Sequence, residues 1–143
     1  MITKIPERFR SRVVLAPQVT GGGGAQAYFA PTPGTMGLTL RAIVKMGDAT
    51  DVAISLKYAD NAAGTNATAW PVNVPVYVNG IRQTDAKAHT VEDATGNFIV
   101  DFCVDPGTVP AEKLIGLSYA NSHNSNLLAA ELIEDVAYKP TAT

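Results

Sequence analysis

Hydrophobic and polar residues alternate along several stretches of the chain. Between Leu38 and Met46 every second residue is apolar, and the same alternation runs from Val52 to Tyr58 and from Phe98 to Val104. A period of two describes a strand with one buried face. Two further strands are predicted at Val72–Asn79 and Leu114–Asn121. The pattern therefore predicts a chain built mainly from strands.

Two stretches are less regular. Pro71 and Pro75 fall in the stretch that ends at Asn79, and proline cannot donate to a sheet ladder, so they indicate an edge position or a break. Leu127–Tyr138 suits either a helix or a strand. We predict a strand there, because a final strand would close the second sheet. Val109–Lys113 is expected to form one short helical turn.

Turn-forming residues separate the strands. The clusters are Met46-Gly47-Asp48, Asp60 to Asn66, Asn79-Gly80, Thr95-Gly96-Asn97 and Asp105-Pro106-Gly107. Asn-Gly is a strong signal for a tight hairpin turn. Strands at intervals of roughly ten residues, joined by such turns, are typical of β-sandwiches and small barrels. The fold class predicted here is all-β, an antiparallel β-sandwich of jelly-roll-like type.

Length and composition narrow the class of protein. A chain of 143 residues fits one domain. Its 17% charged residues and net charge of −2 argue against binding nucleic acid by bulk charge. No apolar run approaches the roughly 20 residues of a membrane helix, and the first residues lack the apolar core of a signal peptide. The single cysteine, Cys103, excludes an internal disulfide.

Charge is spread unevenly along the chain. Residues 1–12 contain four basic side chains and one acidic one, whereas the remainder contains seven basic and twelve acidic side chains. Four consecutive glycines, Gly21 to Gly24, follow, and such a run makes a flexible connection. We therefore predict an extended basic N-terminal arm with a Gly-rich loop over residues 1–24 and a β-sandwich domain over residues 25–143. Within the arm, residues 12–16 are a candidate first strand.

Three arginines of this arm stand at every second position. In an extended chain Arg8, Arg10 and Arg12 point the same way and Phe9 points opposite. One interpretation lays the guanidinium groups on an acidic neighbour and Phe9 in an apolar pocket. The other is an ordinary first strand with solvated charges. The pattern favours neither.

Trp70 is the other candidate contact residue. It follows a polar loop and precedes Pro71, at the junction between a loop and a predicted strand. A ring in that position either plugs the end of the core or anchors a partner protein. The core position is the commoner case, and the partner contact is retained as a hypothesis.

Possible enzymatic and ligand sites are weak. The run Gly21–Gly24 lacks the lysine and the following helix of a phosphate loop. Cys103 stands in the middle of a strand, where a buried inert thiol is the better interpretation. His89 and His123 lie in turn-rich polar sequence with Asp85 and Asp93, without the spacing of metal ligands.

The acidic pairs are also weak candidates for an active site or a metal site. Asp101/Asp105 and Glu131/Glu134 could suggest glycoside hydrolysis, but that chemistry needs two carboxyl groups facing one cleft. Asp48 and Asp51 share a loop without an EF-hand pattern. The sequence therefore predicts a protein that is not an enzyme and that uses no cofactor or metal.

Four segments carry a family resemblance. Ala53 to Ala67 resembles a motif of small structural proteins of tailed bacteriophages, in which an apolar strand ends in a polar turn of the type ATDAAGTGA. Asn97–Asp105 resembles a later strand of that family, and Lys113–Asn121 and Leu127–Pro140 resemble its last two strands. The resemblance spans about residues 38 to 140. The Arg-rich N-terminus has no counterpart in it.

The resemblance implies a jelly-roll-like virion protein of the capsid decoration, or cement, type. Its implied partners are the major capsid protein and neighbouring copies of itself, as a dimer or trimer, with no nucleic acid and no membrane. Its implied location is the capsid exterior, after synthesis in the host cytoplasm. The residues expected at such contacts are Arg8, Phe9, Arg10, Arg12 and Trp70.

Two other classes of function stay open at this point. One is another virion component, such as a tail-associated module that binds a receptor or a carbohydrate, and the polar loop Asn121–Asn126 favours it while the scarcity of aromatic residues opposes it. The other is a cell-wall hydrolase, for which no constellation of residues is present.

Overall fold

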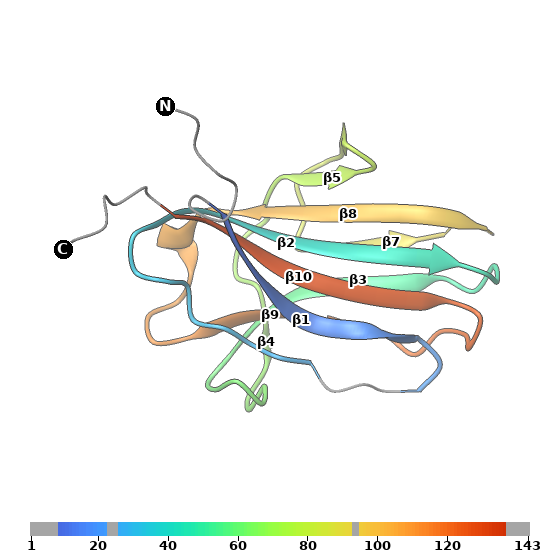
Figure 1. Ribbon diagram of the computed structural model, residues 1–143, viewed down its shortest axis with the longest axis horizontal. Coiled ribbons are helices and arrows are strands. Elements are labelled where there is room, and N and C mark those ends of the chain that lie inside the picture. Colours follow the sequence, from blue (N-terminus) through green and yellow to red (C-terminus); the bar gives the residue numbers. More distant parts are fainter. Residues whose placement is uncertain (1–8, 23–25, 93–94, 137–143) are drawn as a thin grey trace.

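The computed structural model describes residues 9–22, 26–92 and 95–136. In chain order the elements are β1 (Phe9–Val19), β2 (Thr35–Met46), β3 (Val52–Ala59), β4 (Thr68–Ala69), β5 (Val76–Val78), β6 (Ile81–Arg82), β7 (Ala88–Val91), β8 (Gly96–Val104), the 3-10 turn η1 (Pro106–Thr108), β9 (Leu114–Tyr119) and β10 (Leu127–Val136). The strands form two antiparallel sheets packed together (Figure 1), so the predicted all-β sandwich is confirmed. The finer jelly-roll assignment stays a prediction.

The two sheets differ in size. The large sheet has six strands in the order β1-β10-β2-β8-β5-β6. In the small sheet, β3 pairs with β4, β7 and β9. The C-terminal strand β10 therefore lies inside the large sheet, between β1 and β2. The stretch that suited a helix or a strand is a strand, as predicted.

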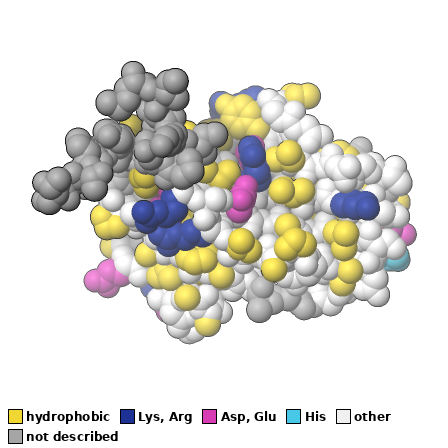
Figure 2. Space-filling model, viewed as in Figure 1, with side chains coloured by type: hydrophobic (Ala, Val, Ile, Leu, Met, Phe, Trp, Pro, Cys, Tyr) yellow, Lys and Arg dark blue, Asp and Glu magenta, His cyan; other side chains and the backbone are white. Residues whose placement is uncertain are grey.

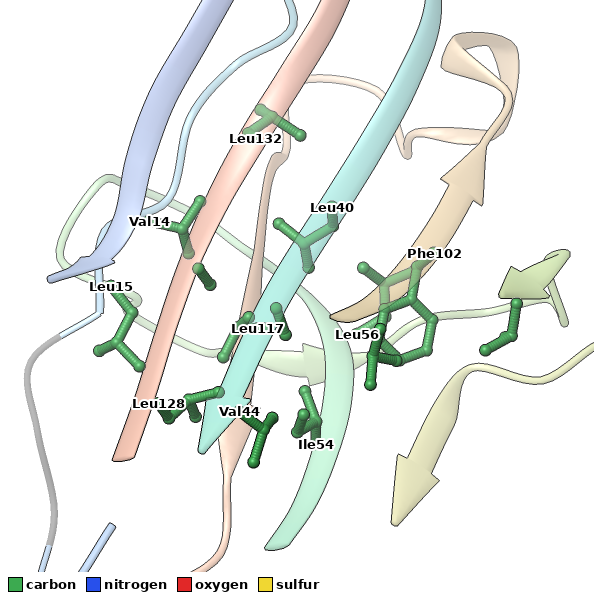
Figure 3. Packing of buried hydrophobic residues seen from close by; sticks show 14 of the residues in the cluster. Val14, Leu15, Leu40, Val44, Ile54, Leu56, Phe102, Leu117, Leu128 and Leu132 are labelled. Carbon is green, nitrogen blue, oxygen red and sulfur yellow. The ribbon is translucent and has the colours of Figure 1, made fainter. Parts of the chain in front are cut away.

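The core fills the space between the sheets. Leu40 of β2 lies opposite Leu132 of β10 and Phe102 of β8, and all three side chains are fully buried. Figure 3 shows how the large sheet meets the small sheet across this core, with Ile54 and Leu56 coming from β3. Alternate residues of each strand point into this layer, which is why the period-two pattern located the strands correctly.

Turn chemistry sets the ends of the short strands. Asn79 and Gly80 have φ values of 49° and 79°, which a two-residue hairpin turn of type I′ requires at both positions. The turn joins β5 to β6. The strand before it is shorter than predicted, because Pro75 has no N–H and only its carbonyl joins the ladder, accepting from the Cys103 N–H at 2.9 Å.

The expected helical turn is displaced. A 3-10 turn forms at η1, upstream of Val109–Lys113, because Asp105 caps it and accepts a hydrogen bond from the Gly107 N–H at 2.9 Å. Pro106 begins the turn, a position where a missing N–H costs nothing.

The expected arm must be corrected where it is described. Residues 9–19 form β1, which pairs with β10 along its length and contributes the buried side chains of Val14 and Leu15. The folded body therefore begins at or before residue 9, not at residue 25. The candidate first strand at residues 12–16 is present and longer than predicted. Residues 1–8, including Arg8, lie outside the described residues.

The segment after the Gly-rich loop joins the two sheets. The Ala27 N–H donates to the Val14 carbonyl of β1 at 2.8 Å, and Phe29 forms an isolated bridge with Ile115 of β9. Tyr28 between them is 3% exposed, and burial raises the pKa of its phenol. Its ring lies over Gly116, where an added Cβ would stand 2.6 Å from the ring.

Replacing Gly116 by valine is therefore expected to displace the Tyr28 ring and to lower the free energy of unfolding by about 1–3 kcal/mol. Urea unfolding followed by circular dichroism measures the loss. Gly37→Ala is the matched control, because a Cβ at Gly37 in β2 would meet only the Asp135 Cβ, at 3.9 Å. Equal stability of the two variants would contradict this packing.

Candidate protein-interaction face

The outward side of the large sheet is the most unusual surface of the described chain. We call it the outer face and define it by the outward side chains of β1, β10, β2 and β8. These are Phe9, Ser11, Val13, Thr39, Arg41, Ile43, Lys45, Asn97, Ile99, Asp101, Cys103, Leu127, Ala129, Glu131, Ile133 and Asp135. They alternate with core residues, so the pleat of the sheet turns them away from the core.

Apolar side chains occupy many of these outward positions. Val13 is 61% exposed and lies opposite Glu131 of β10, and Ile43 is 46% exposed and lies opposite Ala129 of the same strand. Figure 2 shows hydrophobic side chains spread across this face with few charged groups between them. Antiparallel sheets that face water normally carry polar residues there, and large exposed apolar patches mark interaction sites.

A narrow line of charges crosses the middle of the outer face. Glu131 of β10, Arg41 of β2 and Asp101 of β8 stand in register on adjacent strands. The Arg41 guanidinium donates to both Asp101 oxygens, from Nε at 2.8 Å and from Nη2 at 3.0 Å. This hydrogen bonding raises the pKa of Arg41. We call Glu131, Arg41 and Asp101 the charged belt.

Two hollows flank the charged belt. The larger, of about 450 Å³, lies at the Phe9 end and is lined by Gly37, Thr39, Cys103 and Ile133 among others. The smaller, of about 190 Å³, lies on the other side of the belt against Val13, Pro17, Ile43 and Ala129. Apolar atoms make most of both surfaces, so the outer face offers apolar recesses as well as projecting side chains.

The outward side of the small sheet differs. Its outward positions hold small or polar residues, namely Ala53, Ser55, Lys57, Ala88, Thr90, Gly116 and Ser118, and the Tyr28 ring covers Gly116. This composition is the ordinary one for a solvated sheet face. The apolar character of the outer face therefore belongs to one side of the sandwich, not to its surface in general.

The arginines that were predicted to contact a partner make different contacts in the structure. Arg12 turns toward the inner side, where its Nε lies 3.2 Å from Oε1 of the fully buried Glu134 and its guanidinium lies 5.3 Å from the centre of the Phe29 ring. Arg10 is exposed and donates to the Thr32 hydroxyl at 3.2 Å. The charge of Arg12 is thus paired within the fold, and its predicted contact with a partner protein stays a prediction.

Phe9 lies on the opposite side of β1 from these arginines, as the alternation predicted. It is 39% exposed and lines the larger hollow. Trp70 is fully buried, with its ring edge-on to Tyr58 at 6.3 Å between centroids. The expectation that Trp70 contacts a partner is wrong, and the core position is the correct alternative.

One of the acidic pairs considered for catalysis is divided by the large sheet. Glu131 and Glu134 lie three residues apart on β10 and so face opposite sides of the large sheet. Burial raises the pKa of the Cys103 thiol and lowers the pKa of His89.

Among the described residues no cluster of three or more His, Cys, Asp or Glu could hold a metal ion, while Asp93 lies outside them. In the same described part, no helix is long and apolar enough to cross a membrane.

The polar loop Asn121–Asn126 serves the fold. Asn126 is fully buried, and its side-chain oxygen accepts from the N–H groups of Gly47 and Asp48, each at 2.9 Å. Its amide donates to the Thr50 carbonyl at 2.9 Å. The His123 carbonyl accepts from the Thr20 hydroxyl, and the His123 N–H donates to the same hydroxyl. Thr20 is also buried. These bonds tie together the loops at one end of the sandwich.

The outer face was missed as a candidate site, although the sequence held a signal for it. Ile43 and Ile99 occupy the outward, nominally polar positions of two alternating stretches. One such residue is ordinary, and only the strand order places Ile99 opposite Ile43 and Ile43 opposite Ala129 of β10. Neither a family model nor a curated protein matches this sequence.

Proposed function

We propose that this chain is a decoration, or cement, protein of a tailed-bacteriophage head, made in the host cytoplasm and bound to the exterior of the capsid. The observation that carries the proposal is the apolar outer face, because a surface of this kind is suited to binding protein. The resemblance of residues 38 to 140 to small virion proteins supports this class of assembly.

A decoration protein must fold alone and then bind many times to a repeated surface. The sandwich meets the first need with a continuous core, from Val14 in β1 to Leu132 in β10. For the second need it has exposed basic side chains at the start of β1, and the preorganised outer face, whose side chains lose little freedom on binding, is suited to a protein contact within the same assembly. Subunits that bridge neighbouring major capsid proteins would then resist the pressure of packaged DNA mechanically, without any catalytic step.

The contacts with the capsid protein are assigned to the start of β1. Arg10 is exposed there, and Arg8 precedes it outside the described residues. Arginine pairs bidentately with carboxylates, so the capsid surface expected opposite them is acidic. Trp70 is excluded from this contact because it is fully buried, whereas the contact of Arg12 with a partner stays a prediction.

Sedimentation with phage heads tests the proposed function. The purified chain is mixed with expanded and with unexpanded heads of the phage that encodes it, and bound protein is quantified after pelleting. We expect saturable binding to expanded heads at a fixed copy number, with little binding to unexpanded heads. Absence of binding to both forms would contradict the proposal and favour a tail-associated or receptor-binding role.

A further inference from the structure

We propose that the outer face binds the outer face of a second copy of this chain, across a two-fold axis that runs parallel to the strands between β10 and β2. The dimer forms without heads, so it is testable independently of the proposed function, which it deepens by naming the contact between neighbouring copies.

The charged belt selects this axis. A two-fold axis in the plane of contact can run along the strands or across them. Across the strands and through the charged belt, it would place Arg41 against Arg41 of the second copy. Along the strands, between β10 and β2, it places Arg41 opposite Glu131 of the second copy, and the converse contact follows by symmetry. Opposite charges that become desolvated together favour the second arrangement.

The proposed axis also brings projecting side chains opposite hollows on the second copy. The same axis sets β1 of one copy opposite β8 of the other, because β1 adjoins β10 and β8 adjoins β2. Ile99 of β8, 37% exposed, then meets the smaller hollow beside β1 of the second copy. Phe9 of β1 meets the larger hollow, which reaches Cys103 and Val104 of β8. Ile99 and Phe9 thus each face a recess on the second copy, whereas Val13 faces Asp101 and Leu127 faces Lys45.

Small and large side chains also alternate across the axis. Ile43 of β2 and Ala129 of β10 are directly opposite each other within one copy. Under the two-fold operation Ile43 therefore faces Ala129 of the second copy. A large side chain facing a small one on each side of the axis permits interdigitation in the manner of packed sheets.

The available area suffices for a specific contact. Four strands spaced about 4.8 Å apart, each about nine residues long, give a footprint of about 600 Å² per copy. Two copies together would bury about 1,200 Å², which is at the lower end of the range for specific interfaces. We therefore expect a reversible dimer whose population depends on protein concentration.

The dimer has a consequence for head binding. Because the axis runs along the strands, the two β1 strands begin at the same end of the dimer. Both copies of Arg10 then lie at that end of the dimer, on its two opposite outer sides, and a dimer can engage two sites on a repeated surface. Two linked contacts bind more tightly than one through effective concentration.

Sedimentation equilibrium of the full chain in the absence of heads tests the dimer, over about 1–100 µM protein. We expect the apparent mass to rise from that of the 15.0 kDa monomer toward twice that value. Ile43→Asp would bury a carboxylate at the centre of the contact and is expected to weaken dimerisation by at least 100-fold. Ile81→Asp is the matched control, because Ile81 is 68% exposed on β6, away from the outer face.

A monomer at every concentration would overturn the proposal, as would equal association of the two variants. Glu131→Lys tests the axis, since it sets a like charge against Arg41 of the second copy and is expected to weaken dimerisation by at least tenfold. Thermal unfolding verifies that each variant is folded.

Alkylation of Cys103 in the wild-type chain gives a second measurement that needs no variant. The thiol lines the larger hollow, so its reaction is expected to slow as protein concentration rises. A rate independent of concentration would overturn the assigned contact of Phe9. Head binding together with a monomeric chain would leave the proposed function standing and refute the dimer, whereas a dimer that binds no heads would do the reverse.

Discussion

Trp70→Ala is expected to lower the free energy of unfolding by about 3–5 kcal/mol, as measured by urea denaturation at low protein concentration. The indole is fully buried in the cluster between the two sheets and packs edge-on against Tyr58. Its removal leaves a large cavity that the surrounding strands cannot refill.

Trp70→Phe is the matched control for this prediction. The indole Nε1 has no hydrogen-bond partner in the structure, so phenylalanine removes an unsatisfied donor while it keeps most of the apolar volume. We expect a clearly smaller loss than for alanine. A loss below about 1 kcal/mol for Trp70→Ala would show that the ring does not occupy the core and would reopen its role as a partner contact.

Glu134→Ala is expected to cost about 3 kcal/mol of stability, the lower end of the range for breaking a buried ion pair. The carboxylate is fully buried, lies against Arg12, and accepts from the Thr32 N–H at 3.0 Å and from the Thr35 hydroxyl at 3.2 Å. Alanine would leave the arginine and these donors without their acceptor. Arg12 retains 27% exposure, so water can reach part of its charge and limits the loss.

Glu131→Ala is the control, since Glu131 is the same residue type on the same strand but points to the outer face. Its removal from the monomer is expected to change stability by less than about 1 kcal/mol. Thermal or urea unfolding of the two variants side by side makes the comparison. Equal losses of stability would contradict the assignment of Glu134 to a buried ion pair with Arg12.

The strands could be predicted because the alternation and the turn residues that mark them lie within short stretches of sequence. The period-two alternation located β2, β3 and β8, and the Asn79-Gly80 pair located the hairpin between β5 and β6. Leu127–Val136 was ambiguous for a physical reason. Because β10 has Leu128 and Leu132 on its inner side and Leu127 and Ile133 on its outer side, its alternation is weak.

Contacts between distant segments could not be predicted. Arg12 and Glu134 lie 122 positions apart, and only the pairing of β1 with β10 makes them neighbours. The basic charge of the N-terminus therefore indicated an arm, whereas part of that charge neutralises a buried carboxylate. A sequence pattern gives the direction of a side chain along its strand, but it does not give the identity of the neighbouring strand.

The outer face depends on strand order in the same way. Ile43, Ile99 and Ile133 stand in three separate stretches of sequence. They become one surface because β10 inserts next to β2, which also pairs with β8. Once that order is known, the composition of the surface departs from the polar face expected of a solvated antiparallel sheet.

The role of the outer face in assembly is the central claim, and one comparison tests it most directly. Wild-type chain, Ile43→Asp and Ile81→Asp are each titrated against expanded heads, and bound copies are counted after sedimentation. We predict that Ile81→Asp binds as the wild type does, while Ile43→Asp needs at least tenfold more protein for half-saturation. Identical binding curves for the three proteins would contradict the claim.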